Sequence, residues 1–223
     1  MRWYLLLLLL VLTCGVSEPM EDASILPVQA VPESEPAPMP EPEAADFVRV
    51  QEYLPDILVD LKYAGAENFT GQAVYDFTDA YLRYGTVQKL SSALDILMDQ
   101  GYTLLIWDAF RPTQAQFRLW EICPDPVYVA NPETGFSSHS RGNTVDLTLA
   151  ALDGEPVEMP TDFDDFSPLA DRDYSDVPAS AAANAQLLED VLTACGFQPY
   201  TGEWWHFSDL DNYPVEESWS PPK

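Results

Sequence analysis

The sequence contains few basic side chains and very little histidine. Its 223 residues include 10 Lys plus Arg against 37 Asp plus Glu, a formal net charge of −27. Binding to nucleic-acid phosphates needs a basic surface, so this balance excludes most roles on nucleic acid. His139 and His206 are the two imidazoles of the chain, and any histidine-based site must use one or both of them.

Cysteine is also scarce. The three residues Cys14, Cys123 and Cys195 form no C-x-x-C pair, which excludes a thiolate zinc finger and a thioredoxin-like redox motif. Pairing of Cys123 with Cys195 stays open at this stage, because the geometry of the fold decides whether a disulfide forms.

The N-terminal apolar run is short. Leu5–Leu12 follows Arg2 and precedes small residues, whereas a membrane-crossing helix needs about 20 apolar residues. We predict that residues 1–17 are a secretory signal peptide and that the protein is exported, either secreted or associated with the cell envelope. A lipid attached at Cys14 is the alternative, and it or the leader would be the contact with the membrane.

The next segment differs from the rest of the chain in composition. Residues 18–46 hold seven Pro, eight acidic residues and no Lys or Arg, a composition that predicts a disordered or extended spacer. Globular composition begins at Phe47. The part from 47 to 223 contains 29 acidic and 9 basic side chains, a net charge of −20, and we predict that it is the single folded domain.

Hydrophobic spacing within that domain alternates between the helical and the extended period. Because the elements show no regular βαβ rhythm, the pattern predicts an α+β fold, with a long functional loop over 150–180. The predicted elements are a helix through Val87, Leu90, Leu94 and Leu97 that ends near Gly101, a buried strand 102–107, a helix opening at 111–112, a strand 144–149, a helix over 187–192 that ends at Gly196, and a strand around 204–207.

One imidazole and one carboxylate lie seven residues apart, at His139 and Asp146, with Gly142 in the turn between them. This spacing lets both side chains meet one ion, and His206 supplies a second imidazole. Two histidines and one aspartate leave the fourth position of a tetrahedral zinc open to water, as in catalytic sites. Zinc lowers the pKa of bound water. The alternative is two ordinary imidazoles in the core or on the surface.

Two further charged residues lie close to these motifs. Glu203 precedes His206 by three residues, so it must lie at an irregular entry to the strand to reach the same metal. There it could take a proton from water and pass it to a leaving amine; the alternative is a solvated carboxylate. Arg111 follows a buried strand and could stabilise an oxyanion, although spacing alone favours an ion pair with Asp108 almost equally.

Several segments together resemble the zinc D-alanyl-D-alanine dipeptidases of the VanX type. The resemblance implies an α+β fold with a small antiparallel sheet flanked by helices, shared with D,D-carboxypeptidases and the hedgehog signalling domain. It runs in the same order from about Phe47 to about Tyr213 and is carried by Asp60–Ala64, Glu67–Gly71, Ile106–Pro112, Ser137–Gly142, Asp146–Leu149, Phe163–Phe166 and Glu203–Phe207.

The resemblance also implies roles for individual residues. One zinc ion per chain would be held by His139, Asp146 and His206, with Glu203 as the catalytic base and Arg111 as the transition-state stabiliser.

Two further roles concern substrate binding. Ser137 would lie near the substrate carboxylate and Asp164 would face the substrate ammonium, as charge complementarity requires; the alternative for Asp164 is a solvated acidic loop. Phe77 departs from the family, which often has Tyr there, so a substrate-contacting hydroxyl would be missing.

The expected function is hydrolysis of the D-Ala-D-Ala dipeptide to D-alanine by an exported zinc metallopeptidase, in cell-wall peptide turnover. The expected partner is a small D-amino-acid dipeptide, with no nucleic acid and no obligate protein partner. Two alternatives remain, a D,D-carboxypeptidase acting on longer muropeptides and a catalytically silent, zinc-stabilised binding module.

Overall fold

The computed structural model describes residues 41–222. The predicted signal peptide, and the predicted spacer as far as residue 40, lie outside the described residues. Within 41–222, no helix is long and apolar enough to span a bilayer.

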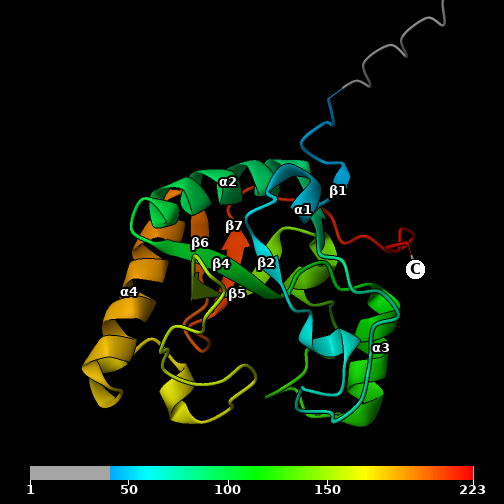
Figure 1. The fold of residues 1–223 in the computed structure, drawn as a ribbon. Helices are drawn as coiled ribbons and strands as arrows, with labels where there is room; N and C mark the ends of the chain where they lie inside the picture. The colour runs from blue at the N-terminus through cyan, green and yellow to red at the C-terminus, as the bar shows by residue number, and fades with distance from the viewer. Residues whose placement is uncertain (1–40, 223) are drawn as a thin grey trace, which may run out of the picture. The chain divides into compact units, whose positions relative to one another are not determined.

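A five-stranded sheet forms the centre of the domain, in the order β2-β4-β5-β7-β6 (Figure 1). Neighbouring strands are antiparallel except β2, which runs parallel to β4 at one edge. The bounds are β2 Leu58–Val59, β4 Tyr102–Asp108, β5 Thr144–Ala151, β6 Phe197–Pro199 and β7 His206–Asp209.

Two long helices cover the sheet. Helix α2 (Tyr84–Met98) packs against β4, and α4 (Ala179–Ala194) packs against β6 and β5 and also contacts α2. Helix α3 (Thr113–Ile122) follows β4 on the other side of the domain (Figure 1). The predicted apolar stripe of α2 is buried, and Gly101 after its end has a positive φ of 88° that favours glycine.

A small second sheet lies next to the C-terminal segment of the domain. Strands β1 (Phe47–Arg49) and β3 (Tyr81–Arg83) pair antiparallel, and the one-turn helix α1 (Val50–Tyr53) follows β1. The C-terminal segment returns here, because the Trp219 ring stacks on Phe47 with a centroid distance of 4.3 Å and the Glu216 amide donates to the Ser140 carbonyl. Strand β1 and the described C-terminal segment are therefore held next to the short helix η2 (Ser138–Arg141).

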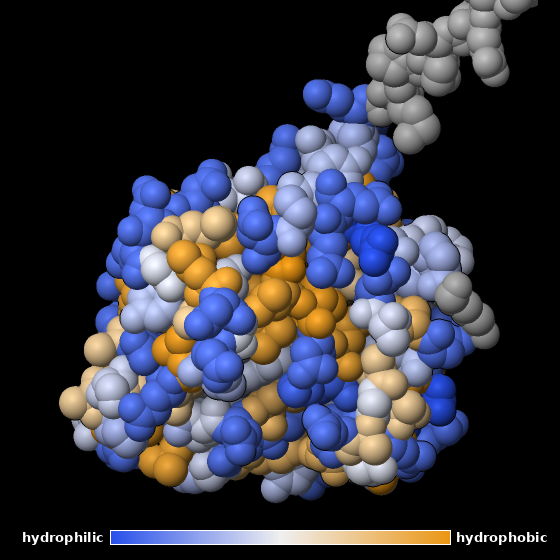
Figure 2. Space-filling model, viewed as in Figure 1, coloured by the Kyte–Doolittle hydropathy of each residue, from blue (hydrophilic) through white to orange (hydrophobic). Residues whose placement is uncertain are grey.

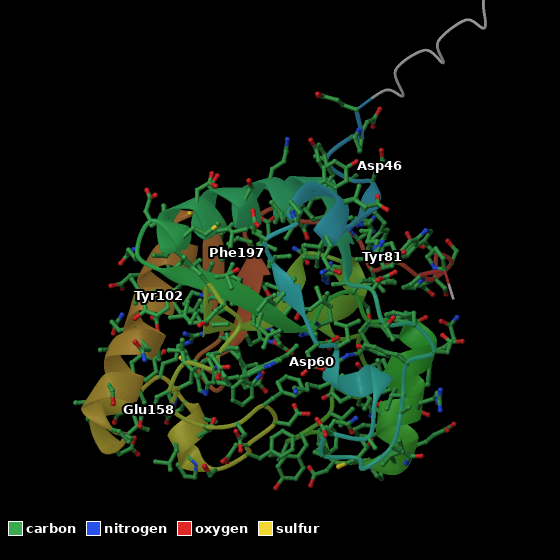
Figure 3. All side chains as sticks on the ribbon, viewed as in Figure 1. Asp46, Asp60, Tyr81, Tyr102, Glu158 and Phe197 are labelled. Atoms are coloured by element: carbon green, nitrogen blue, oxygen red, sulfur yellow. The ribbon has the colours of Figure 1, made fainter. Side chains whose placement is uncertain are left out.

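Side chains fill the space between helices and sheet (Figure 3). The largest buried rings include Trp204, Trp205 and Phe207, which are at most 1 % exposed. Figure 2 shows an apolar area in the middle of one face with hydrophilic side chains around it. Exposed carboxylates such as Asp60 and Glu158, labelled in Figure 3, contribute to the acidic surface.

The predicted α+β class is confirmed, and the sheet differs from the expectation in one detail. We expected an antiparallel sheet, but β2 adds a parallel edge strand through a two-residue pairing that the sequence pattern is too short to reveal. The strand expected around 204–207 begins only at His206, since residues 201–205 form turns. The segment 150–180 contains two short helical turns, η3 (Pro168–Ala170) and η4 (Tyr174–Asp176), between the end of β5 and α4.

Candidate active site

The register of the sheet aligns three polar residues in one row across β4, β5 and β7. Asp146 pairs with Asp108 on one side and with His206 on the other. Directly paired residues on antiparallel strands project their side chains to the same face of the sheet. The row therefore brings a carboxylate and an imidazole together although they are 60 positions apart in the chain.

The short helix η2 brings the second imidazole to this row. His139 lies in η2, directly before β5, and the Ser137 hydroxyl accepts from its backbone amide at 3.3 Å. Gly142 ends η2 with a φ of 76°. A Cβ at that position would lie 2.3 Å from the Phe47 ring, so the turn requires glycine both for its backbone conformation and for the close packing beneath it.

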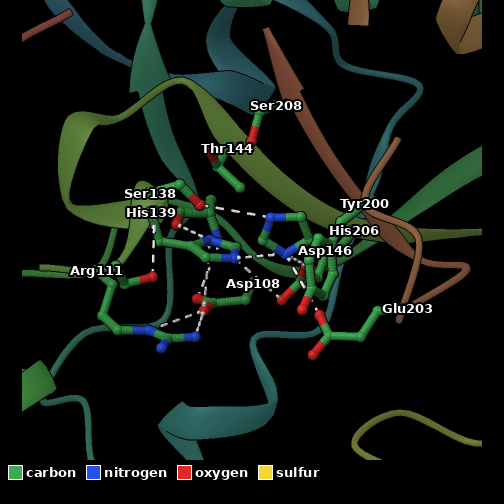
Figure 4. Close-up of polar contacts among 12 residues, drawn as sticks. Asp108, Arg111, Ser138, His139, Thr144, Asp146, Tyr200, Glu203, His206 and Ser208 are labelled. Carbon is green, nitrogen blue, oxygen red and sulfur yellow. Dashed lines mark hydrogen bonds and ion pairs between the residues drawn. The ribbon is translucent and has the colours of Figure 1, made fainter. Parts of the chain in front are cut away.

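His139, Asp146 and His206 offer ligand atoms that all lie within 4.8 Å of one another. Figure 4 shows the two imidazoles turned towards each other with Asp146 beside them. His139 Nε2 lies 3.4 Å from His206 Nδ1 and 3.3 Å from an Asp146 carboxylate oxygen. His206 Nδ1 lies 3.0 Å from the other oxygen, Oδ1.

We call His139, Asp146 and His206 the triad. Hydrogen bonds to residues outside the triad fix which imidazole nitrogen atoms face its centre. His139 Nδ1 lies 2.8 Å from the Ala109 carbonyl, which can only accept, so Nδ1 carries the proton and Nε2 presents its lone pair. His206 Nε2 meets the Ser138 hydroxyl at 3.4 Å, which leaves Nδ1 facing the triad. Asp146 Oδ1 is buried without a hydrogen bond from any described residue. Converging lone pairs and a buried carboxylate fit a divalent metal ion.

The electrostatics of the triad also favour a positive charge at its centre. Burial by itself lowers the pKa of His139, but Asp146 and Asp108 outweigh it, and the pKa is raised overall. Burial alone would raise the pKa of Asp146, yet the two imidazoles hold it below its usual range. A bound cation would take over the stabilisation that the imidazolium otherwise gives to the carboxylate.

Glu203 approaches the triad from the turn before β7. Its carboxylate lies 3.5 Å from His206 Nδ1, and the turn confirms the expectation that this residue must precede the regular strand. Burial, and then repulsion from Asp146, raises the pKa of Glu203. A carboxyl with a raised pKa beside candidate metal ligands is suited to accept and return a proton.

Arg111 lies on the opposite side of the triad, where it makes the ion pair with Asp108 and also lines the cavity. Its Nε and Nη2 donate to Asp108 Oδ2 at 3.2 and 2.6 Å, and its side chain also lines the cavity beside His139. Asp108 is held in turn by the Tyr75 hydroxyl at 2.7 Å. The ion pair therefore fixes the guanidinium at the cavity wall.

Asp164 is half-buried in the wall of the same cavity. The Tyr63 hydroxyl donates to its carboxylate at 2.9 Å, and its backbone has a φ of 56°, unusual for a residue other than glycine. Burial raises the pKa of Asp164 to about 8. It is thus not a solvated loop residue, and a cationic group entering the cavity would stabilise its charged form.

One cavity of about 330 Å³ brings all the predicted site residues together. That volume lies at the small end of the range of ligand pockets, about 300–1,000 Å³. The site residues that line it are Arg111, Ser137, His139, Asp146, Asp164, Glu203 and His206.

Comparison with known proteins assigns the chain to a family. Residues 43–220 match peptidase family M15, described as D-ala-D-ala dipeptidase. The chain belongs to this family.

Three relatives that carry the name D-alanyl-D-alanine dipeptidase show how much of the chain the likeness covers. The Escherichia coli (strain K12) protein is 38% identical over 175 residues, which span 78% of this chain and 90% of the relative. The Streptomyces coelicolor protein is 37% identical over 73% of this chain and 91% of its own length. The Enterococcus faecium protein is 33% identical over 75% and 94%.

Three further side chains surround the site of this family member; sequence reasoning assigned no role to Tyr63 and Ser138, and it interpreted Tyr200 as core or pocket wall. The cavity is also lined by Tyr63, Ser138 and Tyr200, and the Tyr200 ring packs against His206 at a centroid distance of 5.5 Å. Tyr63 belongs to one of the segments that carried the resemblance, and this was the available signal. Ser138 belongs to another of these segments, Ser137–Gly142, and the position of Tyr200 in the cavity wall agrees with its interpretation.

Two other expectations concern residues outside the cavity. Phe77 stacks on Tyr75 at 4.7 Å and does not line the cavity, so the ring at this position removes no hydroxyl from the cavity wall. Cys123 and Cys195 are both free and half-buried within the described part of the chain.

Proposed function

We propose that this chain is a zinc-dependent dipeptidase that hydrolyses D-Ala-D-Ala to two molecules of D-alanine. The observation that carries the proposal is the convergence of His139, Asp146 and His206 within 4.8 Å, in a cavity that Glu203 and Arg111 also reach. Membership of the D-ala-D-ala dipeptidase family supports the choice of substrate.

The residues on the two sides of the cavity have different functions in hydrolysis. A zinc ion held by His139, Asp146 and His206 would supply Lewis acidity, which polarises the peptide carbonyl and lowers the pKa of water. Glu203 takes a proton from the attacking water and later delivers it to the leaving amine. Arg111 lies opposite and donates hydrogen bonds to the oxyanion that develops on the carbonyl oxygen.

The remaining walls suit a short substrate with both termini free. Asp164, half-buried and held by Tyr63, attracts the ammonium group of the dipeptide. Ser137 lies beside the triad through its bond to the His139 amide, close enough to the cavity to receive the substrate carboxylate. Both contacts depend on a free terminus, which favours a dipeptide over a longer chain.

Zinc content and turnover should be measured on the same purified protein. We expect about one zinc per chain, release of D-alanine from D-Ala-D-Ala, and loss of activity with a chelator that zinc restores. Glu203→Gln should keep its zinc and lose about 100- to 10,000-fold in kcat, because it removes general acid–base catalysis.

The matched control is Glu121→Gln, an exposed glutamate on α3, which should retain wild-type turnover. Zinc-loaded wild type that is as inert as Glu203→Gln on D-amino-acid peptides would instead support a silent binding module. A higher kcat/KM on a pentapeptide stem than on the dipeptide would support a D,D-carboxypeptidase.

The site of action is a second part of the proposal. The apolar run Leu5–Leu12 after Arg2, followed by an acidic and Pro-rich segment, supports export of the enzyme. A cell that destroys D-Ala-D-Ala to resist glycopeptides must do so in the cytoplasm, before the dipeptide joins the wall precursor. An exported enzyme acts on dipeptide released from the wall, so its role is wall turnover or scavenging.

Cell fractionation tests this location. We expect the active protein in the medium or the envelope fraction, shortened at its N-terminus as mass spectrometry would show. Active protein found mainly in the cytoplasm with residues 1–17 intact would contradict export. The enzyme would then have access to the dipeptide before it joins the wall precursor.

A further inference from the structure

Gln116 is a polar residue on α3 that is completely buried. Its side-chain oxygen accepts from Arg111 Nη1 at 3.1 Å, and its side-chain nitrogen donates to the Ala130 carbonyl at 2.7 Å. Burying an amide is costly unless both of its ends are hydrogen-bonded. Here both ends of the Gln116 amide are hydrogen-bonded, and one of the partners is Arg111, a residue of the proposed catalytic machinery.

The bond from Gln116 completes the support of the Arg111 guanidinium. Asp108 Oδ2 accepts from Nε and Nη2, along one edge of the group. Nη1 lies beyond that edge, and Gln116 holds it from the adjacent helix. With all three nitrogens bonded, the guanidinium plane has one orientation at the cavity wall, where the Tyr63 ring centroid lies 5.1 Å from its central carbon.

The second bond connects Gln116 to the segment of the cavity wall that follows α3 in the chain. Residues 126–130 line the cavity and form turns and irregular structure without a helix or strand of their own. The Ala130 carbonyl at the end of this segment is bound by Gln116. Gln116 therefore links a charged side chain of the site, a framework helix and a loop that shapes the cavity.

We propose that Gln116 is a positioning residue for Arg111. It fixes the guanidinium in the orientation that receives the developing oxyanion, and it anchors the wall segment 126–130 at the same point. The inference rests on the proposed function, since it assumes that Arg111 acts on the transition state. A misdirected donor costs more in the transition state than in substrate binding, so kcat rather than KM should report the loss.

Gln116→Met tests the inference, because methionine has a similar length and makes neither hydrogen bond. In zinc-loaded protein we expect kcat on D-Ala-D-Ala to fall about tenfold or more, the scale of a hydrogen bond to a charged group. KM should change less than about twofold, and zinc content should stay at the wild-type value. Affinity for a phosphinate dipeptide analogue, which mimics the tetrahedral state, should fall by the same factor as kcat.

Two further variants separate positioning from a general loss of packing. Gln116→Glu keeps the acceptor for Arg111 and loses the donor to Ala130, so it should recover part of the kcat that Gln116→Met loses. Combined with Arg111→Met, Gln116→Met should lower kcat no further, because it acts through Arg111. Gln114→Met, at an exposed position on the same helix, is the control and should match wild type.

The outcomes distinguish this inference from the proposed function. Wild-type protein that binds zinc but neither hydrolyses D-Ala-D-Ala nor binds the phosphinate would overturn the function, and the positioning role with it. Active wild type with an equally active Gln116→Met would overturn the positioning role alone. The positioning role would also be overturned if Gln116→Met lost zinc together with kcat, or if it lowered kcat by the same factor in the Arg111→Met background.

Discussion

At the scale of single residues, the site depends on groups whose partners are themselves held in place. Arg111 is fixed by Asp108, and Asp108 by the Tyr75 hydroxyl. The tautomer of His139 follows from one backbone carbonyl, that of Ala109. Each of these supports reduces the rotameric freedom of a functional side chain before any substrate arrives, which is how a site gains catalytic precision.

The raised pKa of Asp164 affects how the free energy of unfolding depends on pH. Burial raises its pKa to about 8, far above the value near 4 of an unfolded chain. Between these values the folded protein keeps a proton that the unfolded chain has lost, so this residue makes stability fall as pH rises. In metal-free protein, Asp164→Asn should therefore gain about 1–3 kcal/mol in unfolding free energy relative to wild type between about pH 5 and about pH 7.

Urea denaturation of both proteins across that pH range measures the difference. Asp162→Asn, an exposed acidic neighbour, is the control and should run parallel to wild type. If the curves of Asp164→Asn and wild type were also parallel, Asp164 would be ionised in the folded protein throughout the range.

At the scale of secondary-structure elements, the register of the strands determines which site residues lie side by side. The pairings of Asp146 with Asp108 and with His206 place three site residues in one row. A slip of one residue in either pairing would turn one of these side chains to the other face of the sheet. A register shift in the β4–β5 pairing between Ile106 and Asp108 brings Asp108 level with Asp146. Both strands are largely buried, so packing of the core and geometry of the site are decided together.

Turns supply the functional groups that regular strands could not place. Glu203 reaches the triad because residues 201–205 form turns before β7. His139 lies in a short helix that Gly142 ends in the left-handed region. Both groups belong to irregular segments next to rigid strands, an arrangement common in enzymes because the framework stays fixed while loops carry the chemistry.

At the scale of the whole molecule, charge is the dominant feature. The part of the chain from Phe47 onward has a net charge of −20. Like charges on one compact body repel each other, and this repulsion weakens as salt shortens the screening length from about 30 Å at 0.01 M to about 8 Å at 0.15 M.

We therefore expect sodium chloride to stabilise the zinc-loaded protein. Raising it from about 10 mM to about 150 mM should increase the melting temperature by a few degrees, corresponding to about 1–2 kcal/mol. Differential scanning calorimetry gives the measurement, with an uncharged solute at the same osmolality as the control. A melting temperature that stays constant or falls with salt would show that the acidic surface does not limit stability.

The sequence by itself determined the chemistry of this protein and the class of its fold. Two histidines near acidic residues, in motifs resembling those of a known family, were sufficient to predict a set of residues that the structure brings into one cavity. The helices α2 and α4 and the strands β4 and β5 followed from hydrophobic spacing, because a buried face imposes its period on the residues.

The tertiary structure decided what depends on contacts between distant segments. The parallel pairing of β2, the bond of Gln116 to Arg111 and the burial of Asp164 leave no local pattern, since each depends on where another segment of the chain packs. The same holds for Arg111, whose two alternatives were equal by spacing. Only the folded chain makes its ion pair with Asp108 part of the cavity wall.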